Sequence, residues 1–472
     1  MNAHAPSAGL GAMLQRARRR AGLTQEQLAG LSTVSVRAIR DLEQGRVQHP
    51  RRETLRLLAD AMRLTGARRA ELELAVDGAS AGNALRDVYS AELAPPPTPL
   101  RPLTGRRPEL QALTGLLSTE HERLLTIVGL PGVGKSRLAQ EAALLLHARD
   151  RIPVLWVAMD GGDDPSAGVT RSPQSAMVSW VRALVSHGGN HDELTSVIRD
   201  KATLLVLDGL EASPTVGPAL LNLLHSCERL KVLITAREPH QTPGGRLFPL
   251  APLPVPGLSH ASAPLPGDSL VADRPAVELM LSYVSHMRPD LLPTDSVTTT
   301  VAHVCDALDG VPQALEAAAS WLLLYSPEQL LEIARTTPLA LIDGATPDPR
   351  SGSELGRLLA AAVTGLRPQP AALLSAMASL ADRADAASHA RADLSSGFWT
   401  VQSAADLLGI SPAEAARDVH VLLLRGLIRQ PPAARADLGR PARFMVLNLV
   451  RRLLHSEPAP ETTAHTPVLA GA

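Results

Sequence analysis

The feature that most constrains the fold of this chain is a run at residues 124–146, LLTIVGLPGVGKSRLAQEAALLL. It opens with five mostly apolar residues, as buried strands do, and closes with residues that favour helix. The glycines between them let backbone N–H groups converge on phosphate oxygens, and the N-terminus of the following helix favours negative charge. The run therefore predicts a phosphate-binding loop between a strand and a helix.

Further short apolar runs lie at 153–160, 203–208, 231–237 and 246–250, and longer helix-like segments separate most of them. Continuous apolar strands that alternate with helices are typical of parallel sheets covered on both faces. We therefore expect a parallel α/β core over residues 103–250.

The loop GLPGVGKS, residues 129–136, carries the residue types that nucleotide binding needs. In this pattern a lysine reaches the β- and γ-phosphates and the next serine or threonine coordinates Mg²⁺. Lys135 is one of only three lysines in the chain. The predicted nucleotide-binding residues here are Gly129, Gly132, Gly134, Lys135, Ser136 and Arg137. The alternative is a chance match in a glycine-rich turn.

Two later strands end in polar residues. Asp208 ends the run at 203–208, where we expect it to hold Mg²⁺ together with Ser136, and Glu211 follows as a candidate for orienting an attacking water. Thr235 and Arg237 end the next run, where a γ-phosphate sensor is expected. Ordinary strand-end capping for the acids and a surface ion pair for the arginine are the alternatives.

The N-terminal block, residues 1–78, is basic, with 13 arginines against 8 acidic residues. Its pattern predicts three successive helices. Leu10, Met13, Leu14 and Ala17 share one face of the first, Thr24 and Gln27 form a capping box for the second with Leu28 and Leu31 buried, and Ser35 caps the third. On the third, Ile39 and Leu42 face inward while Arg37, Arg40 and Gln44 point away. This arrangement suits a helix that lies in the major groove of DNA. A basic bundle that binds a protein is the alternative.

The stretch AGLTQEQLAGLSTVSVRAIRDLEQG at 21–45 resembles the Cro/C1-type (XRE) helix-turn-helix. The resemblance implies that Gln25 contacts a phosphate and that Ser35, Val36, Arg37 and Arg40 face bases or backbone. Thr33 stands where the family usually has glycine, so a residue with a Cβ must adopt an unfavourable φ at the turn.

The core and the segments on its C-terminal side resemble the STAND class of P-loop NTPases, of the NB-ARC type. PLTGRRPELQAL, with Gly105 and Arg106, is similar to the motif that lies near the adenine, and CDALDGVPQALEAAAS, with Gly310 and Pro312, is similar to the family's GxP segment. The resemblance implies a helical lid at 273–345 and a winged helix at 346–455. Relatives carry a Met-His-Asp motif that touches ADP, and Val446, Leu447 and Asn448 stand at those positions here, so the histidine contact is absent.

The complete fold prediction is a multidomain chain: an all-α helix-turn-helix bundle, a P-loop NTPase core with a parallel sheet, a helical lid and a winged helix. Proline-rich residues 79–102 form a linker, 251–272 a loop and 456–472 a disordered tail. With two cysteines and no apolar run long enough for a membrane span, we expect a cytoplasmic, nucleoid-associated protein with no membrane partner.

The sequence thus predicts a transcriptional regulator that binds double-stranded DNA and is switched by ATP or ADP with Mg²⁺, with slow hydrolysis. We expect a homo-oligomer, either a dimer or a nucleotide-dependent assembly, and a separate protein partner or sensor. The alternatives are a STAND-type signalling or defence scaffold without an operator, an AAA+-like motor, and a plain repressor whose NTPase core is a relic.

Overall fold

The computed structural model describes residues 10–44, 46–47, 52–64, 96–159, 195, 198, 201–211, 216–239, 242–256, 274–343, 354–387, 398–430 and 441–455. They belong to two compact units. The first comprises 1–102, 110–127 and 136–248, and the second comprises 103–109, 128–135 and 249–472.

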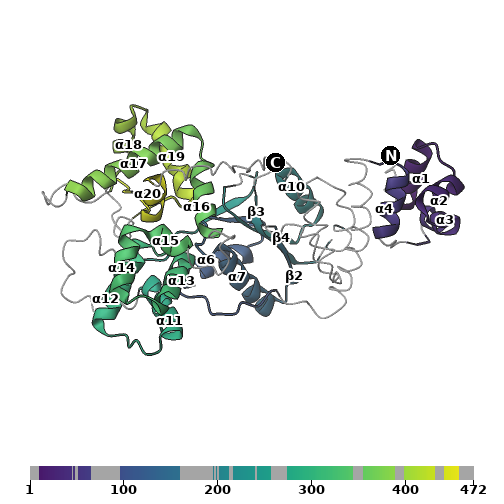
Figure 1. Ribbon diagram of the computed structural model, residues 1–472. Coiled ribbons are helices and arrows are strands. Elements are labelled where there is room, and N and C mark those ends of the chain that lie inside the picture. The colour runs from purple at the N-terminus through teal and green to yellow at the C-terminus, as the bar shows by residue number, and fades with distance from the viewer. Residues whose placement is uncertain are drawn as a thin grey trace, which may run out of the picture. The chain divides into compact units, whose positions relative to one another are not determined.

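The chain begins with a small helical bundle in the first unit. Its helices are α1 (Leu10–Arg20), α2 (Gln25–Ser32), α3 (Val36–Glu43) and α4 (Arg52–Ala61), all purple in Figure 1. They enclose a core of leucine, isoleucine, alanine and methionine side chains: Leu14, Leu28, Ile39, Leu42, Leu55, Leu58, Ala59 and Met62. The predicted apolar faces of the first and third helices are therefore confirmed.

The turn between α2 and α3 has the predicted chemistry. Thr24 forms a capping box with Gln27, and the Ser35 hydroxyl accepts a bond from the Ala38 amide. Thr33 adopts the left-handed conformation, with φ 56°, that the family usually gives to glycine. One expectation was wrong: Leu31 is 63% exposed, because Leu28 and Ser32 take the buried side of this short helix.

The α/β core holds a five-stranded sheet in the order β2-β3-β4-β1-β5. The strands are β1 (Leu124–Val128), β2 (Val154–Ala158), β3 (Thr203–Leu210), β4 (Leu230–Ala236) and β5 (Arg246–Pro249). The pairs β2–β3 and β3–β4 are parallel, and β1, β3 and β4 are buried almost throughout. The predicted parallel α/β core is confirmed.

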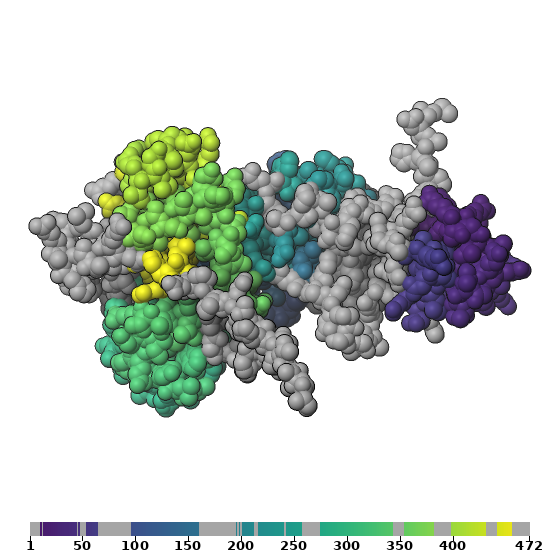
Figure 2. All heavy atoms as spheres, turned by 45° about the horizontal axis from the view of Figure 1, so that its top comes forward, coloured from purple at the N-terminus to yellow at the C-terminus, as the bar shows by residue number. Residues whose placement is uncertain are grey.

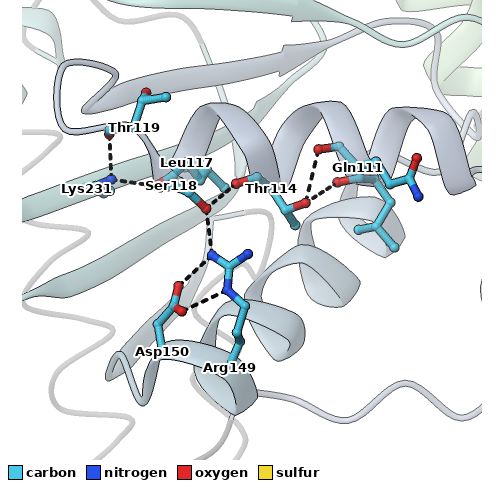
Figure 3. Close-up of polar contacts among 9 residues, drawn as sticks. Gln111, Thr114, Leu117, Ser118, Thr119, Arg149, Asp150 and Lys231 are labelled. Carbon is cyan, nitrogen blue, oxygen red and sulfur yellow. Dashed lines mark hydrogen bonds and ion pairs between the residues drawn. The ribbon is translucent and has the colours of Figure 1, made fainter.

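Three described helices belong to this core: α6 (Arg107–Ser118), α7 (Lys135–Asp150) and α10 (Val216–Ser226). The C-terminal end of α6 is tied to its surroundings by side chains from two other elements (Figure 3). Lys231 at the start of β4 donates to the carbonyls of Leu117 and Thr119, and Arg149 of α7 donates to the Ser118 hydroxyl at 2.7 Å. Cations at this position satisfy the last carbonyls of the helix and its dipole.

The second unit is mostly helical after residue 274. A helical segment, residues 275–343, contains α11 (Pro275–Met287), α12 (Asp295–Ala307), α13 (Pro312–Ser320), the short η1 (Trp321–Leu323), α14 (Pro327–Thr336) and α15 (Pro338–Asp343). Next come α16 (Glu354–Thr364) and α17 (Pro368–Ala387). The helical character predicted for 273–345 is confirmed for these described residues.

The C-terminal segment, residues 399–455, contains α18 (Val401–Leu408), α19 (Pro412–Leu424), β6 (Ile428–Arg429), β7 (Met445–Val446) and α20 (Asn448–His455). Strands β6 and β7 pair antiparallel, and Trp399 bridges to Phe444 beside them. Helix α20 contacts α15, α16 and α17, and in Figure 2 it is the yellow surface beside the green helices.

Parts of the predicted linker, loop and tail fall outside the described residues. The linker is described only from residue 96, the loop at 251–272 only to residue 256, and the tail at 456–472 not at all. In the part of the chain that the structure describes, no helix is long and apolar enough to cross a membrane.

Candidate functional sites

The first candidate site is the exposed face of α3. Its N-terminus is fixed by Ser35, whose hydroxyl lies 3.2 Å from the Ala38 nitrogen. The Arg37 side chain is 93% exposed and lies 3.9 Å from the Asp41 carboxylate, and Arg40 is exposed on the next turn. Val36 is half-buried. Ser35, Arg37 and Arg40 are therefore accessible on one capped helix, with Val36 half-buried beside them.

A buried acid in the last turn of α3 positions this face. Arg18 of α1 donates two hydrogen bonds to the Glu43 carboxylate, from Nε at 2.6 Å and Nη2 at 2.9 Å, and Gln25 of α2 donates a third at 2.8 Å. The Glu43 side chain is 3% exposed. Burial alone raises the pKa of Glu43, but the bonds from Arg18 and Gln25 outweigh burial and leave its pKa below the usual value. Three helices are thus joined at one carboxylate.

Sequence reasoning missed this network. Arg18 stands in a run of arginines that gives no sign of burial, yet its side chain is only 11% exposed. Gln25, expected at a DNA phosphate, has its amide nitrogen bound to Glu43. The capping box at Thr24 and Gln27 gave no information about contacts 18 or 25 residues away along the chain.

The second candidate site is the GLPGVGKS loop, residues 129–136, which joins β1 to α7 and is the predicted phosphate-binding loop. Gly129, Gly132 and Gly134 have positive φ angles of 150°, 76° and 98°. In the second unit, the Lys135 ammonium group donates to the carbonyls of Gly129 at 2.9 Å and Leu130 at 3.0 Å. The lysine side chain therefore lies folded over the loop. To reach the β- and γ-phosphates of a nucleotide, it must instead extend away from these two carbonyls.

The loop is held by segments on both sides of it in the sequence. Arg106 donates to the Val133 carbonyl at 3.0 Å and to Glu109 at 3.0 Å, and its side chain is 4% exposed. Burial lowers the pKa of Arg106 despite the neighbouring Glu109. On the other side, the backbone amide of Gln313 donates to the Gly132 carbonyl at 3.2 Å. Gln313 follows Pro312, the first residue of α13. Gly105 approaches Pro275 too closely to allow a Cβ.

In the first unit, the polar strand ends form two small clusters. The Thr235 hydroxyl donates to the Asp208 carboxylate at 2.6 Å and accepts a bond from the Gly209 amide at 2.8 Å. Thr235, proposed from sequence as a phosphate sensor, therefore orients Asp208. Arg237 lies 3.6 Å from Glu211, whose side chain is 80% exposed, so the surface ion pair considered for this arginine is present.

Ser136 and Arg137 open α7 in this same unit. Ser136 is exposed, and Arg137 pairs with Glu141 at 2.9 Å. Ser136 supplies a hydroxyl oxygen and Asp208 a carboxylate oxygen, which are ligand types that Mg²⁺ prefers. Among the described residues, no group of three His, Cys, Asp or Glu side chains forms a protein-only metal site. The donor set fits a metal that keeps water and phosphate ligands.

The positions aligned with the Met-His-Asp motif are apolar or turned to the backbone. Val446 is 2% and Leu447 0% exposed. The side-chain amide of Asn448 donates to the Asp306 carbonyl at 3.1 Å. Leucine at the middle position cannot donate a hydrogen bond to a phosphate.

Comparison with known proteins identifies the N-terminal bundle. Residues 10–72 match the model of a helix-turn-helix domain. Over 238 residues the chain is 32% identical to an uncharacterized protein of Mycobacterium tuberculosis, covering 49% of this chain and 53% of that protein. Over 215 residues it is 30% identical to a protein of the same organism named as an HTH-type transcriptional regulator, covering 45% of this chain and 21% of that protein. The chain spans about half the length of the first of these relatives and about a fifth of the second.

Among solved structures, Cdc6p from Pyrobaculum aerophilum aligns with 76% of this chain and 96% of its own, at 13% identity and a TM-score of 0.28. A similarity at this level carries no conclusion about the fold or the activity.

Proposed function

We propose that this chain is a transcriptional regulator that binds double-stranded DNA through α3 and is switched by ATP or ADP at its phosphate-binding loop. One observation carries the proposal: a helix-turn-helix domain with exposed arginines shares a chain with a strand, a GLPGVGKS loop and a helix. The name of the mycobacterial relative as an HTH-type transcriptional regulator supports the DNA-binding half.

For the DNA-binding half, Arg37 and Arg40 supply long, exposed donors on the first two turns of α3. Arginine can bond both acceptors of a guanine edge in the major groove, and each such pair contributes about 1 to 3 kcal/mol of discrimination. Ser35 and Val36 lie at the same end, and we propose that Gln25 contacts the DNA backbone from α2 with the amide hydrogen that Glu43 does not take. Phosphate contacts position the domain, whereas contacts to base edges specify the sequence.

For the nucleotide-binding half, Lys135 exchanges its two carbonyl partners for the β- and γ-phosphates, and the loop glycines present backbone N–H groups. Arg106 and Pro312 lie on the segments that hold the loop. Ser136 and Asp208 would hold Mg²⁺, which would neutralise charge on the phosphates when bound. We propose slow hydrolysis, because Glu211, the candidate for orienting water, is exposed and paired with Arg237.

We further propose that the helical segment acts as an NB-ARC-type lid and the C-terminal segment as a winged helix. The antiparallel β6–β7 pair after α19 supports the second assignment. With Leu447 buried at the histidine position, ADP is held without that contact. A homo-oligomer and a separate sensor protein are part of this proposal.

The experiment that tests the proposal is a genome-wide footprint of the tagged chain in its own cells. Arg37→Ala is compared with Arg56→Ala, which removes an equal charge from an exposed position on α4. We expect a few sharp sites that Arg37→Ala loses and Arg56→Ala retains. Diffuse occupancy, equal in all three proteins, would instead favour a signalling scaffold whose helix-turn-helix contacts proteins.

A further inference from the structure

Asp309 is a fully buried acid that neither candidate site uses. It lies just after α12 and is 0% exposed, with φ 56° in the left-handed region. The next residue, Gly310, has φ 67°, and a Cβ there would collide with the Leu253 carbonyl. Backbone bonds from Gly310 to Cys305 and from Leu253 to Gly310 fix the turn. The position of Asp309 is therefore set by a tight, well-supported turn.

The Asp309 carboxylate reaches out of the helical segment into the C-terminal segment. Its Oδ2 accepts a bond from the Leu449 amide at 2.9 Å, in the first turn of α20. The Arg429 guanidinium of β6 lies 3.9 Å from Oδ1, and the Arg429 side chain is 15% exposed. An acid at a helix N-terminus satisfies an amide that the helix cannot pair itself and complements the helix dipole. Asp309 thus joins two elements of the C-terminal segment to the turn before α13.

Whether the Asp309 side chain carries its charge depends on the groups around it. Burial raises the pKa of Asp309, while Arg429 and the amides of Leu449 and Asn448 counteract that rise, as does Arg451. Separating a buried carboxylate from its cation leaves an uncompensated charge in a low-dielectric interior. Within the described residues the buried Oδ1 of Asp309 has no hydrogen-bond partner, so it depends on the charge of Arg429 at 3.9 Å, and moving Arg429 away destabilises the carboxylate.

Both partners of this ion pair lie close in sequence to a contact with the phosphate-binding loop. Four residues after Asp309, the Gln313 amide donates to the Gly132 carbonyl at 3.2 Å. Three residues before Arg429, Gly426 packs so tightly against the loop that a Cβ would lie 2.7 Å from the Leu130 nitrogen. Two contacts with the loop, one ion pair and two short stretches of chain therefore connect the loop, Gln313, Asp309, Arg429 and Gly426 within the second unit.

We propose that the joint formed by Asp309, Arg429 and the N-terminus of α20 transmits the state of the phosphate-binding loop to the C-terminal segment. The inference rests on the proposed nucleotide switch and names the residues that couple it. A shift of the loop backbone when a phosphate enters or leaves moves Gln313 and Gly426 and strains the joint. The joint then makes or breaks as a unit, which is how small shifts become discrete rearrangements in packed interiors.

The test is amide hydrogen exchange of α20 in the full chain, with saturating ADP or a non-hydrolysable ATP analogue. Asp309→Asn keeps an acceptor for the Leu449 amide but loses the charge, and Arg429→Gln removes the cation. The control is Asp290→Asn, which breaks the exposed Arg288–Asp290 ion pair in the same unit. Binding of both nucleotides is measured for every protein.

We expect the α20 exchange rates of the wild type and the control to differ by about tenfold between the two nucleotides. In Asp309→Asn and Arg429→Gln we expect that difference to fall within about twofold while both nucleotides still bind. If one variant fails to fold, the other decides the question.

Two results overturn the inference and leave nucleotide binding standing. One is a full difference retained in a folded variant, and the other is a wild type that binds both nucleotides with identical α20 exchange. A wild type that binds neither nucleotide overturns the proposed function itself, and the inference with it.

Discussion

The helix-turn-helix bundle and the predicted phosphate-binding loop hold their candidate functional residues in different ways. In the bundle, α3 presents Arg37 and Arg40 to solvent, and the support comes from neighbouring helices of the same bundle, through Glu43 and a small apolar core. The loop is supported by Arg106 before it and by Gln313, far along the chain after it. The bundle is thus a self-contained positioning device, whereas the loop depends on distant parts of its unit.

Glu43→Ala tests most strongly whether the buried network supports α3 within the bundle. It leaves Arg18 buried without its carboxylate and removes the partner of Gln25, so we expect a loss of about 3 kcal/mol in the stability of the bundle. Hydrogen exchange of the α1–α3 amides in the full chain measures the loss. Glu26→Ala removes an exposed acid from α2 and serves as the control. Equal protection in the two variants would show that the buried network does not position α3.

Arg106→Gln tests whether the loop depends on support from distant residues. The substitution removes the charged donor that holds the Val133 carbonyl, so we expect the dissociation constant for ADP to rise about tenfold, equivalent to about 1.4 kcal/mol. Isothermal titration of the full chain measures it, with the exposed neighbour Arg107→Gln as the control. An unchanged affinity would mean that the loop keeps its shape without this distant support.

The smallest expected effect concerns the turn before α3. Thr33 has a β-branched side chain in the left-handed region, so Thr33→Gly should stabilise the bundle by about 0.5 to 1 kcal/mol. Thr33→Ala loses the same hydroxyl, which bonds the Ser32 carbonyl, but keeps a Cβ. Thermal unfolding followed by exchange of the α2 and α3 amides compares the three proteins. A glycine variant no more stable than the alanine variant would show that the turn is not strained.

These two regions also show what the sequence can and cannot predict. The strands, the helix caps at Thr24 and Ser35, and the unusual turn at Thr33 depend on neighbouring residues, and they were predicted. The Glu43 network, the Arg106 bond to the loop and the Asp309 joint depend on pairs that lie 18 to 140 residues apart. Polar pairs at that range leave no periodic pattern in the sequence. The chain contains many arginines, and position alone does not show which of them has a buried partner.

Leu31 shows a second limit of prediction from sequence, in which a local pattern predicted burial and the structure does not have it. Helical spacing from Leu28 favoured burial, but in an eight-residue helix the tertiary packing decided otherwise, and the smaller Ser32 is buried instead. Spacing predicts which residues share a face, whereas the neighbouring helices determine how far that face extends.

The central claim is that nucleotide at the loop controls DNA binding by the helix-turn-helix. It is tested most directly by the affinity of the full chain for a footprinted site at fixed salt, with ADP and with a non-hydrolysable ATP analogue. Lys135→Ala is compared with Lys201→Ala, which removes an exposed lysine just before β3 and outside the loop. We predict about a tenfold difference between the nucleotides in the wild type and in Lys201→Ala, and none in Lys135→Ala. Equal affinity in both nucleotides for the wild type would contradict the account.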